Sequence, residues 1–231
     1  MIMRIFLFLL SLISLLNTQV NCQRLPEPVL CGSRYEMPTG YLGSQYFNSK
    51  WVKGDVLLHD STLVTNQQLR YNGFLDELIW NCCDTCFEVR VDKGLTKGFV
   101  LKPVGLPEAK FVKLKVKPDV LSDSAETYAQ ELYRGSVSCY ALRKIVIRGY
   151  TLMGAGGSSY ILENLEERPE YLLVFGGGQQ ILISKISRRR LLKTLPESLQ
   201  ALALQIVSKE NLRLRDEESL IKFVKLMAGN E

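Results

Sequence analysis

A cluster of three cysteines, Cys82, Cys83 and Cys86, is the sharpest chemical motif in the sequence. Thiolates bind zinc and carry out redox chemistry. A zinc site needs a fourth ligand, which another cysteine or the single histidine could supply, but the sequence contains no second Cys-x-x-Cys and no histidine pair. Redox thiols are activated at a helix N-terminus, whereas predicted strands flank this cluster on both sides. We therefore expect structural disulfides, joining Cys86 to Cys82 or Cys83, or one of these residues to Cys31 or Cys139.

His59, Asp60 and Ser61 have the residue types of a catalytic triad in consecutive positions. A triad needs the imidazole to bridge the other two groups, and neighbouring side chains diverge. We therefore interpret His59 as a turn residue at the end of a strand.

Acidic residues occur as adjacent pairs, Asp76 with Glu77 and Glu166 with Glu167. Adjacent residues of a strand point to opposite faces, so neither pair forms an acid/base couple by itself. A hydrolase would have to bring dispersed acidic residues together through the fold.

The densest positive patch is Arg188, Arg189 and Arg190. We expect a solvent-exposed face here, with contacts to anionic lipid headgroups or surface polysaccharide as the alternative. The glycines of residues 154–157 lack the lysine that closes a phosphate-binding loop, so we predict no cofactor.

The N-terminus has the order of a signal peptide: Arg4, an apolar run at residues 5–16, then polar residues. The run is shorter than the roughly 20 residues that a membrane-spanning helix needs. We expect residues 1–22 to be removed, which leaves a mature protein without a transmembrane span in the periplasm, at the cell surface or secreted. A lipid anchor at Cys22 is the less favoured alternative, because Asn21 is bulky where such sites require a small residue.

Export also argues against a nucleic-acid partner, and the net charge of +5 is mild. Residues 23–52 are rich in proline and glycine, which predicts an irregular lead-in. Residues 53–184 form a β-rich domain in which short alternating strands are separated by turns, with Asn72-Gly73 suited to a tight hairpin turn. Residues 123–132 fit either a strand within a hairpin or a helix.

Residues 185–231 have a helical period instead and form a segment packed on the β-rich domain. Pro196 begins one helix and Asp216 caps a second, which ends at Gly229. The fold class is therefore α+β (mainly β): an antiparallel domain built of hairpins with a C-terminal cap of two to three helices.

Several of these stretches carry a resemblance: Gly-Asp-Val-Leu-Leu at 54–58, Leu-Arg-Tyr-Asn at 69–72, Asp-Glu-Leu-Ile-Trp at 76–80, and the C-terminal pattern from 188 to 221. The chain resembles, over residues 40–228, exported cell-envelope proteins of Bacteroidetes type with no assigned function. The resemblance implies export and a layout of strands followed by helices, and it carries over no catalytic residue.

The sequence thus predicts a non-enzymatic envelope protein that binds another protein or a surface polysaccharide. The alternatives are a secreted hydrolase-like enzyme with dispersed acidic residues and a metal or redox module based on the cysteine cluster.

Overall fold

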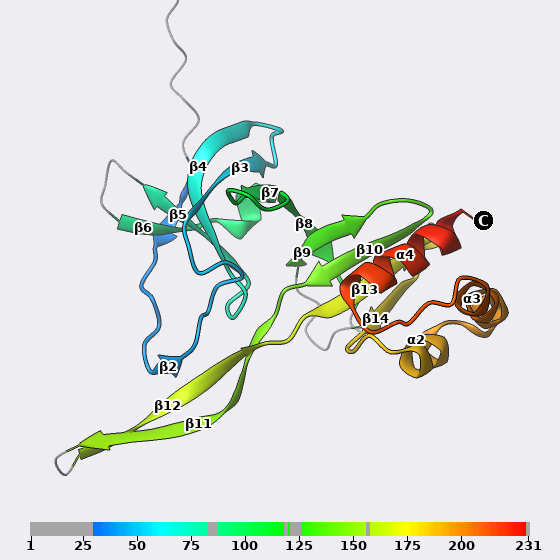
Figure 1. Cartoon of the computed structure of the whole chain (residues 1–231). Coiled ribbons are helices and arrows are strands. Elements are labelled where there is room, and N and C mark those ends of the chain that lie inside the picture. Colours follow the sequence, from blue (N-terminus) through cyan, green and yellow to red (C-terminus); the bar gives the residue numbers. More distant parts are fainter. Residues whose placement is uncertain (1–29, 83–86, 118–119, 121–125, 156–157, 230–231) are drawn as a thin grey trace, which may run out of the picture.

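The computed structural model describes residues 30–82, 87–117, 120, 126–155 and 158–229. They form two β-sheets and three α-helices, and the helices all lie at the C-terminal end of the chain (Figure 1). The predicted mainly β fold with a helical cap is therefore confirmed.

The larger sheet has eleven strands, every neighbouring pair of which is antiparallel, in the order β1-β6-β5-β4-β3-β7-β8-β9-β10-β13-β14. Its strands are β1 (Gly32–Arg34), β3 (Val52–Leu58), β4 (Leu63–Asn72), β5 (Glu77–Cys82), β6 (Phe87–Val91), β7 (Thr96–Lys102), β8 (Ala109–Lys115), β9 (Glu126–Tyr133), β10 (Val137–Leu142), β13 (Glu170–Phe175) and β14 (Gln180–Ile183).

The N-terminal half of this sheet curls around an aromatic core. Tyr71, Phe99, Phe111 and Tyr128 come from four different strands and contact one another in stacked, tilted and edge-on pairs. Gly54 permits the close approach of β3 to β7, since a Cβ there would lie 2.3 Å from the Val100 carbonyl oxygen. The irregular register between β3 and β4 adjoins the same glycine, and such irregularities bend a sheet.

The C-terminal half of the sheet is covered on one face by α2 (Arg188–Thr194), α3 (Glu197–Lys209) and α4 (Glu217–Ala228). All six residues of β10 are buried. Cys139 and its alternate neighbours face the helices, whereas Tyr140 and Leu142 pack into a separate cluster on the opposite face. Burial on both faces explains why this strand has an uninterrupted run of apolar and small residues.

The helices begin and end where the sequence predicts. Pro196 precedes α3, Asp216 caps α4 by accepting a hydrogen bond from the Ser219 amide at 2.8 Å, and Gly229 follows α4. The buried residues of α4 form one stripe of the helix: Leu220, Phe223, Val224 and Met227. A short helix, α2, precedes both of the longer ones.

Two strand predictions need correction or completion. The hairpin between β4 and β5 does not turn at Asn72-Gly73 alone: residues 73–76 separate the strands, and Asp76 adopts a positive φ of 56°. The ambiguous segment is a strand where it is described, because β9 begins at Glu126; residues 123–125 lie outside the described residues.

The smaller sheet was not predicted. Strands β11 (Ile145–Ala155) and β12 (Ser158–Glu167) form a long antiparallel hairpin that projects from the body of the protein (Figure 1), and we call it the β-arm. The short strand β2 (Tyr41–Leu42), which belongs to the expected irregular lead-in, pairs with β12 at Glu163 and Asn164.

Candidate functional site

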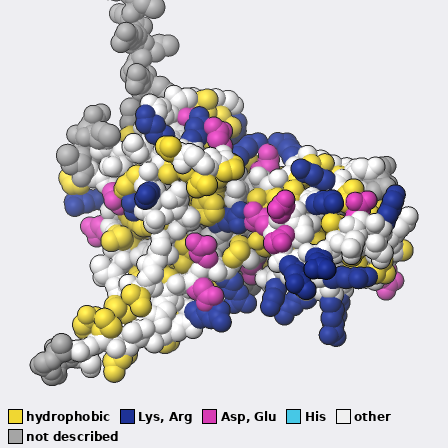
Figure 2. All heavy atoms as spheres, in the orientation of Figure 1, with side chains coloured by type: hydrophobic (Ala, Val, Ile, Leu, Met, Phe, Trp, Pro, Cys, Tyr) yellow, Lys and Arg dark blue, Asp and Glu magenta, His cyan; other side chains and the backbone are white. Residues whose placement is uncertain are grey.

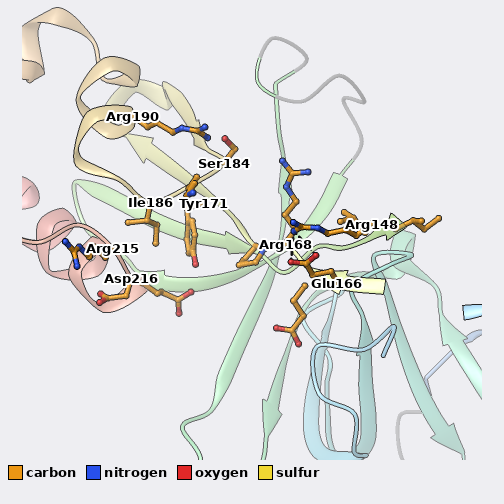
Figure 3. A pocket seen from close by; sticks show the side chains of 15 residues that line it. Arg148, Glu166, Arg168, Tyr171, Ser184, Ile186, Arg190, Arg215 and Asp216 are labelled. Carbon is orange, nitrogen blue, oxygen red and sulfur yellow. Dashed lines mark hydrogen bonds and ion pairs between the residues drawn. The ribbon is translucent and has the colours of Figure 1, made fainter. Parts of the chain in front are cut away.

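A pocket of about 770 Å³ lies where the root of the β-arm meets the helical cap. Its walls come from both strands of the arm, from β13, from the segment after β14, from α2 and from the start of α4, and Figure 3 shows their side chains. The lining residues are Val146, Ile147, Arg148, Glu166, Glu167, Arg168, Pro169, Tyr171, Ser184, Lys185, Ile186, Arg190, Arg215, Asp216 and Glu217.

Three acidic residues in the pocket wall already have partners. Glu166 forms an ion pair with Arg148 at 2.8 Å. Glu217 accepts two hydrogen bonds from the Arg143 guanidinium behind the wall. Asp216 caps α4, and the hydrogen bond from the Ser219 backbone amide lowers the pKa of its carboxyl group.

Four basic residues that line the same pocket are different. Arg168, Lys185, Arg190 and Arg215 form no ion pair with any residue in the described part of the chain. In Figure 3, Arg168 lies on the side of the β-arm, while Arg190 and Ser184 lie on the wall of the helical cap. Among the lining acids only Glu167 has no described partner, so the unpaired charge of the pocket is mainly positive.

Only one residue of the predicted arginine patch belongs to this pocket. Arg188, Arg189 and Arg190 are all exposed in the first turn of α2, but only Arg190 lines the pocket. Lys and Arg side chains gather on the lower side of the helical half in Figure 2. Sequence reasoning missed Arg168, because nothing near it in sequence indicates that the turn after β12 lines the same pocket as α2.

The outer part of the β-arm exposes large apolar side chains: Tyr150 by 68%, Leu152 by 70% and Ile161 by 64%. Leu152 pairs with Ile161 in the hairpin, so these two lie side by side on one face. Met153 and Tyr160 form the next pair and are also exposed. Figure 2 shows the corresponding hydrophobic surface along the outer arm. The signal in the sequence is the absence of any charged residue from 149 to 162.

The cysteines do not form the expected disulfides where they can be followed. Cys82 and Cys139 are both buried free thiols in different cores, so neither residue forms a disulfide. Cys82 packs with the aromatic core and Cys139 under the helices, because a free cysteine behaves as a small apolar side chain. Cys83 and Cys86 lie outside the described residues, and the pairing of these two stays a prediction.

No group of three histidine, cysteine or acidic residues that could hold a metal ion occurs in the described ranges. His59 follows β3 directly, as expected, and its Nε2 lies 2.9 Å from the Lys113 ammonium. Aromatic side chains of the lead-in pack into the protein: Tyr35 and Tyr46 are buried, and Trp51 stacks on Arg70.

The acidic pairs join strands and turns together. Asp76 accepts a hydrogen bond from the Tyr71 hydroxyl at 2.8 Å and binds the Lys93 ammonium, which fixes the turn between β4 and β5. Glu77 forms an ion pair with Arg90 on the neighbouring strand β6.

In the described part of the chain, no helix combines the length and apolar character needed to cross a membrane. No family model, curated protein or solved structure matches this chain.

Proposed function

We propose that this chain is an exported, non-enzymatic interaction protein that docks onto another protein through its β-arm. The observation that carries this proposal is the exposed apolar surface of the outer arm. Tyr150, Leu152 and Ile161 share one face of the hairpin, and their exposed fractions amount to about 400 Å² at roughly 200 Å² per side chain. This area is within the roughly 300–600 Å² found for the largest apolar patch of a monomeric protein, and such patches often mark interaction sites. Met153 and Tyr160 expose further apolar surface on the opposite face.

The arm also offers backbone hydrogen bonds. β11 is an edge strand, and beyond the Tyr150–Glu163 pair no third described strand covers the hairpin. This free portion extends about 17 Å, at about 3.4 Å per residue. Natural proteins usually protect such an edge with charged residues or proline, but Arg148 is the only charged residue in β11. An extended strand from a partner protein would satisfy this edge and cover the apolar faces.

Insertion of the arm into a lipid bilayer fits less well. Both edges of the free hairpin carry unpaired backbone groups, and each such group costs several kcal/mol in the hydrocarbon region. A protein partner satisfies these groups, whereas lipid tails do not. No observation of comparable weight supports the two alternative functions, a hydrolase and a metal or redox module based on the cysteine cluster.

The test is a comparison of Leu152→Asp with Leu204→Asp. Leu204 is an exposed apolar residue on α3, far along the chain from the arm, and serves as the matched control. Purified wild type and the control should retain the same polypeptide from an extract of their own cell envelope, and Leu152→Asp should reduce its recovery at least tenfold. Equal recovery by all three proteins, or recovery by none, would contradict the proposal. Circular dichroism melting curves establish that each variant is folded.

A further inference from the structure

The pocket at the root of the β-arm combines three kinds of surface. Arg168, Lys185, Arg190 and Arg215 supply positive charge and form no ion pair within the described residues. Ser184 contributes a hydroxyl group and Glu167 a carboxylate. The remaining wall is apolar and includes the largely buried ring of Tyr171 and the side chains of Ile147, Pro169 and Ile186.

The size and shape of the pocket limit what it can hold. Its volume of about 770 Å³ is within the roughly 300–1,000 Å³ of small-molecule sites. A single phosphate or sulfate ion would fill only a small part of that space. The pocket is concave, so the headgroups of a flat membrane would not reach its inner wall.

An acidic carbohydrate matches all three kinds of surface. Its carboxylate groups can accept charge-assisted hydrogen bonds from arginine and lysine. Its hydroxyl groups can donate to a carboxylate and exchange hydrogen bonds with a serine hydroxyl. The C–H face of a sugar ring can pack against a tyrosine ring and aliphatic side chains.

We infer that the pocket at the root of the β-arm binds an acidic saccharide, with Arg168 and Arg190 holding a sugar carboxylate between the arm and the helical cap. Arg168 follows β12, and Arg190 belongs to α2. A ligand held by both would therefore bridge the arm and the cap. This site is separate from the exposed apolar surface of the outer arm through which the protein is proposed to dock.

The experiment uses the purified mature chain and a fluorescently labelled oligogalacturonate, a sugar chain with one carboxylate per ring, as the probe. Fluorescence anisotropy should show saturable binding, and a neutral labelled maltooligosaccharide of the same length should not bind. Arg168→Ala and Arg190→Ala should each weaken binding about tenfold, the factor that corresponds to one lost charge-assisted contact of about 1.4 kcal/mol.

Arg189→Ala is the matched control, because it removes the same charge from the same helix turn but from a residue outside the pocket. It should change the affinity less than twofold. The inference is overturned if the wild type fails to bind oligogalacturonate, if the neutral sugar binds equally well, or if Arg189→Ala weakens binding as much as Arg190→Ala.

Two further measurements distinguish the saccharide from other negatively charged ligands. Inorganic phosphate at millimolar concentration should not displace the probe, and vesicles with anionic lipid should bind less tightly than the sugar and without dependence on Arg168. Displacement of the probe by phosphate would identify phosphate as the ligand instead of the saccharide. Vesicle binding with the same Arg168 dependence would identify anionic lipid as the ligand. Leu152→Asp should bind the probe normally, so failure of the docking proposal is distinguishable from failure of this one.

Discussion

The guanidinium group of Arg143 donates two hydrogen bonds to the carboxylate of Glu217, at 2.7 and 2.8 Å. Arg143 lies just before β11, and Glu217 is the first residue of α4. The pair therefore joins the root of the β-arm to the helical cap. The same guanidinium donates to Gln130 on β9 at 2.6 Å, so one side chain connects three parts of the fold.

We predict that the Arg143–Glu217 pair stabilises the folded state by about 2 kcal/mol, the range for a bidentate, partly buried charged pair. A double-mutant cycle with Arg143→Ala and Glu217→Ala, followed by urea denaturation, measures the coupling energy. The exposed Lys222–Glu210 pair, 3.7 Å apart, is the control and should contribute under about 0.5 kcal/mol. Equal coupling energies for the two pairs would contradict the prediction.

The packing of the helical cap on the sheet provides a second prediction. Phe223 is fully buried in the core beneath α4. Because Phe223→Ala leaves a cavity, it should lower the free energy of unfolding by about 3–5 kcal/mol. Leu204→Ala, at an exposed site in α3, should change it by less than about 0.5 kcal/mol. Similar effects of both substitutions would mean that the cap is not packed as described.

The thiol of Cys139 should be chemically silent in the folded protein. Burial, with the nearby Glu217 carboxylate as a second cause, raises the pKa of Cys139 to about 12, and the thiolate is the reactive form. Alkylation with iodoacetamide at pH 8, followed by peptide mass spectrometry, should leave the Cys139 peptide unmodified until denaturant is added. Equal labelling rates in native and denatured protein would show that this thiol is accessible.

Stability should fall at alkaline pH. Burial, followed by the effect of Glu217, raises the pKa of Tyr171 to about 12, whereas an unfolded tyrosine titrates near 10. Above pH 10 the unfolded chain therefore binds fewer protons than the folded one, and the stabilisation present below pH 10 is lost towards pH 12. Urea titrations at pH 8 and pH 11 measure this loss, which should be smaller in Tyr171→Phe. An unchanged pH dependence in that variant would assign the effect to other groups.

Particular residues show how far the sequence predicts this structure. The apolar stripe of α4 and its cap at Asp216 are local patterns, and local geometry is sufficient to predict them. The disulfides expected through Cys82 and Cys139 are absent, because cysteine count and export say nothing about distance and these two thiols pack in separate cores.

The candidate site was less predictable than the fold. Arg190 could be named because it belongs to a charged run, but its contribution to a pocket depends on Arg168, which the turn after β12 brings to the same pocket. The β-arm was missed because its glycines at 154–157 suggested a loop, although the charge-free segment from 149 to 162 contains apolar residues of two strands.

The most direct test of the docking role is site-specific photo-crosslinking from the arm in the cells that make the protein. A photoreactive amino acid replaces Leu152 in one strain and Leu204 on α3 in another. We predict a discrete adduct with one envelope protein from position 152 and none from position 204, and mass spectrometry should locate the crosslink in an extended segment of that partner. No adduct at position 152, or the same adducts from both positions, would contradict docking through the β-arm.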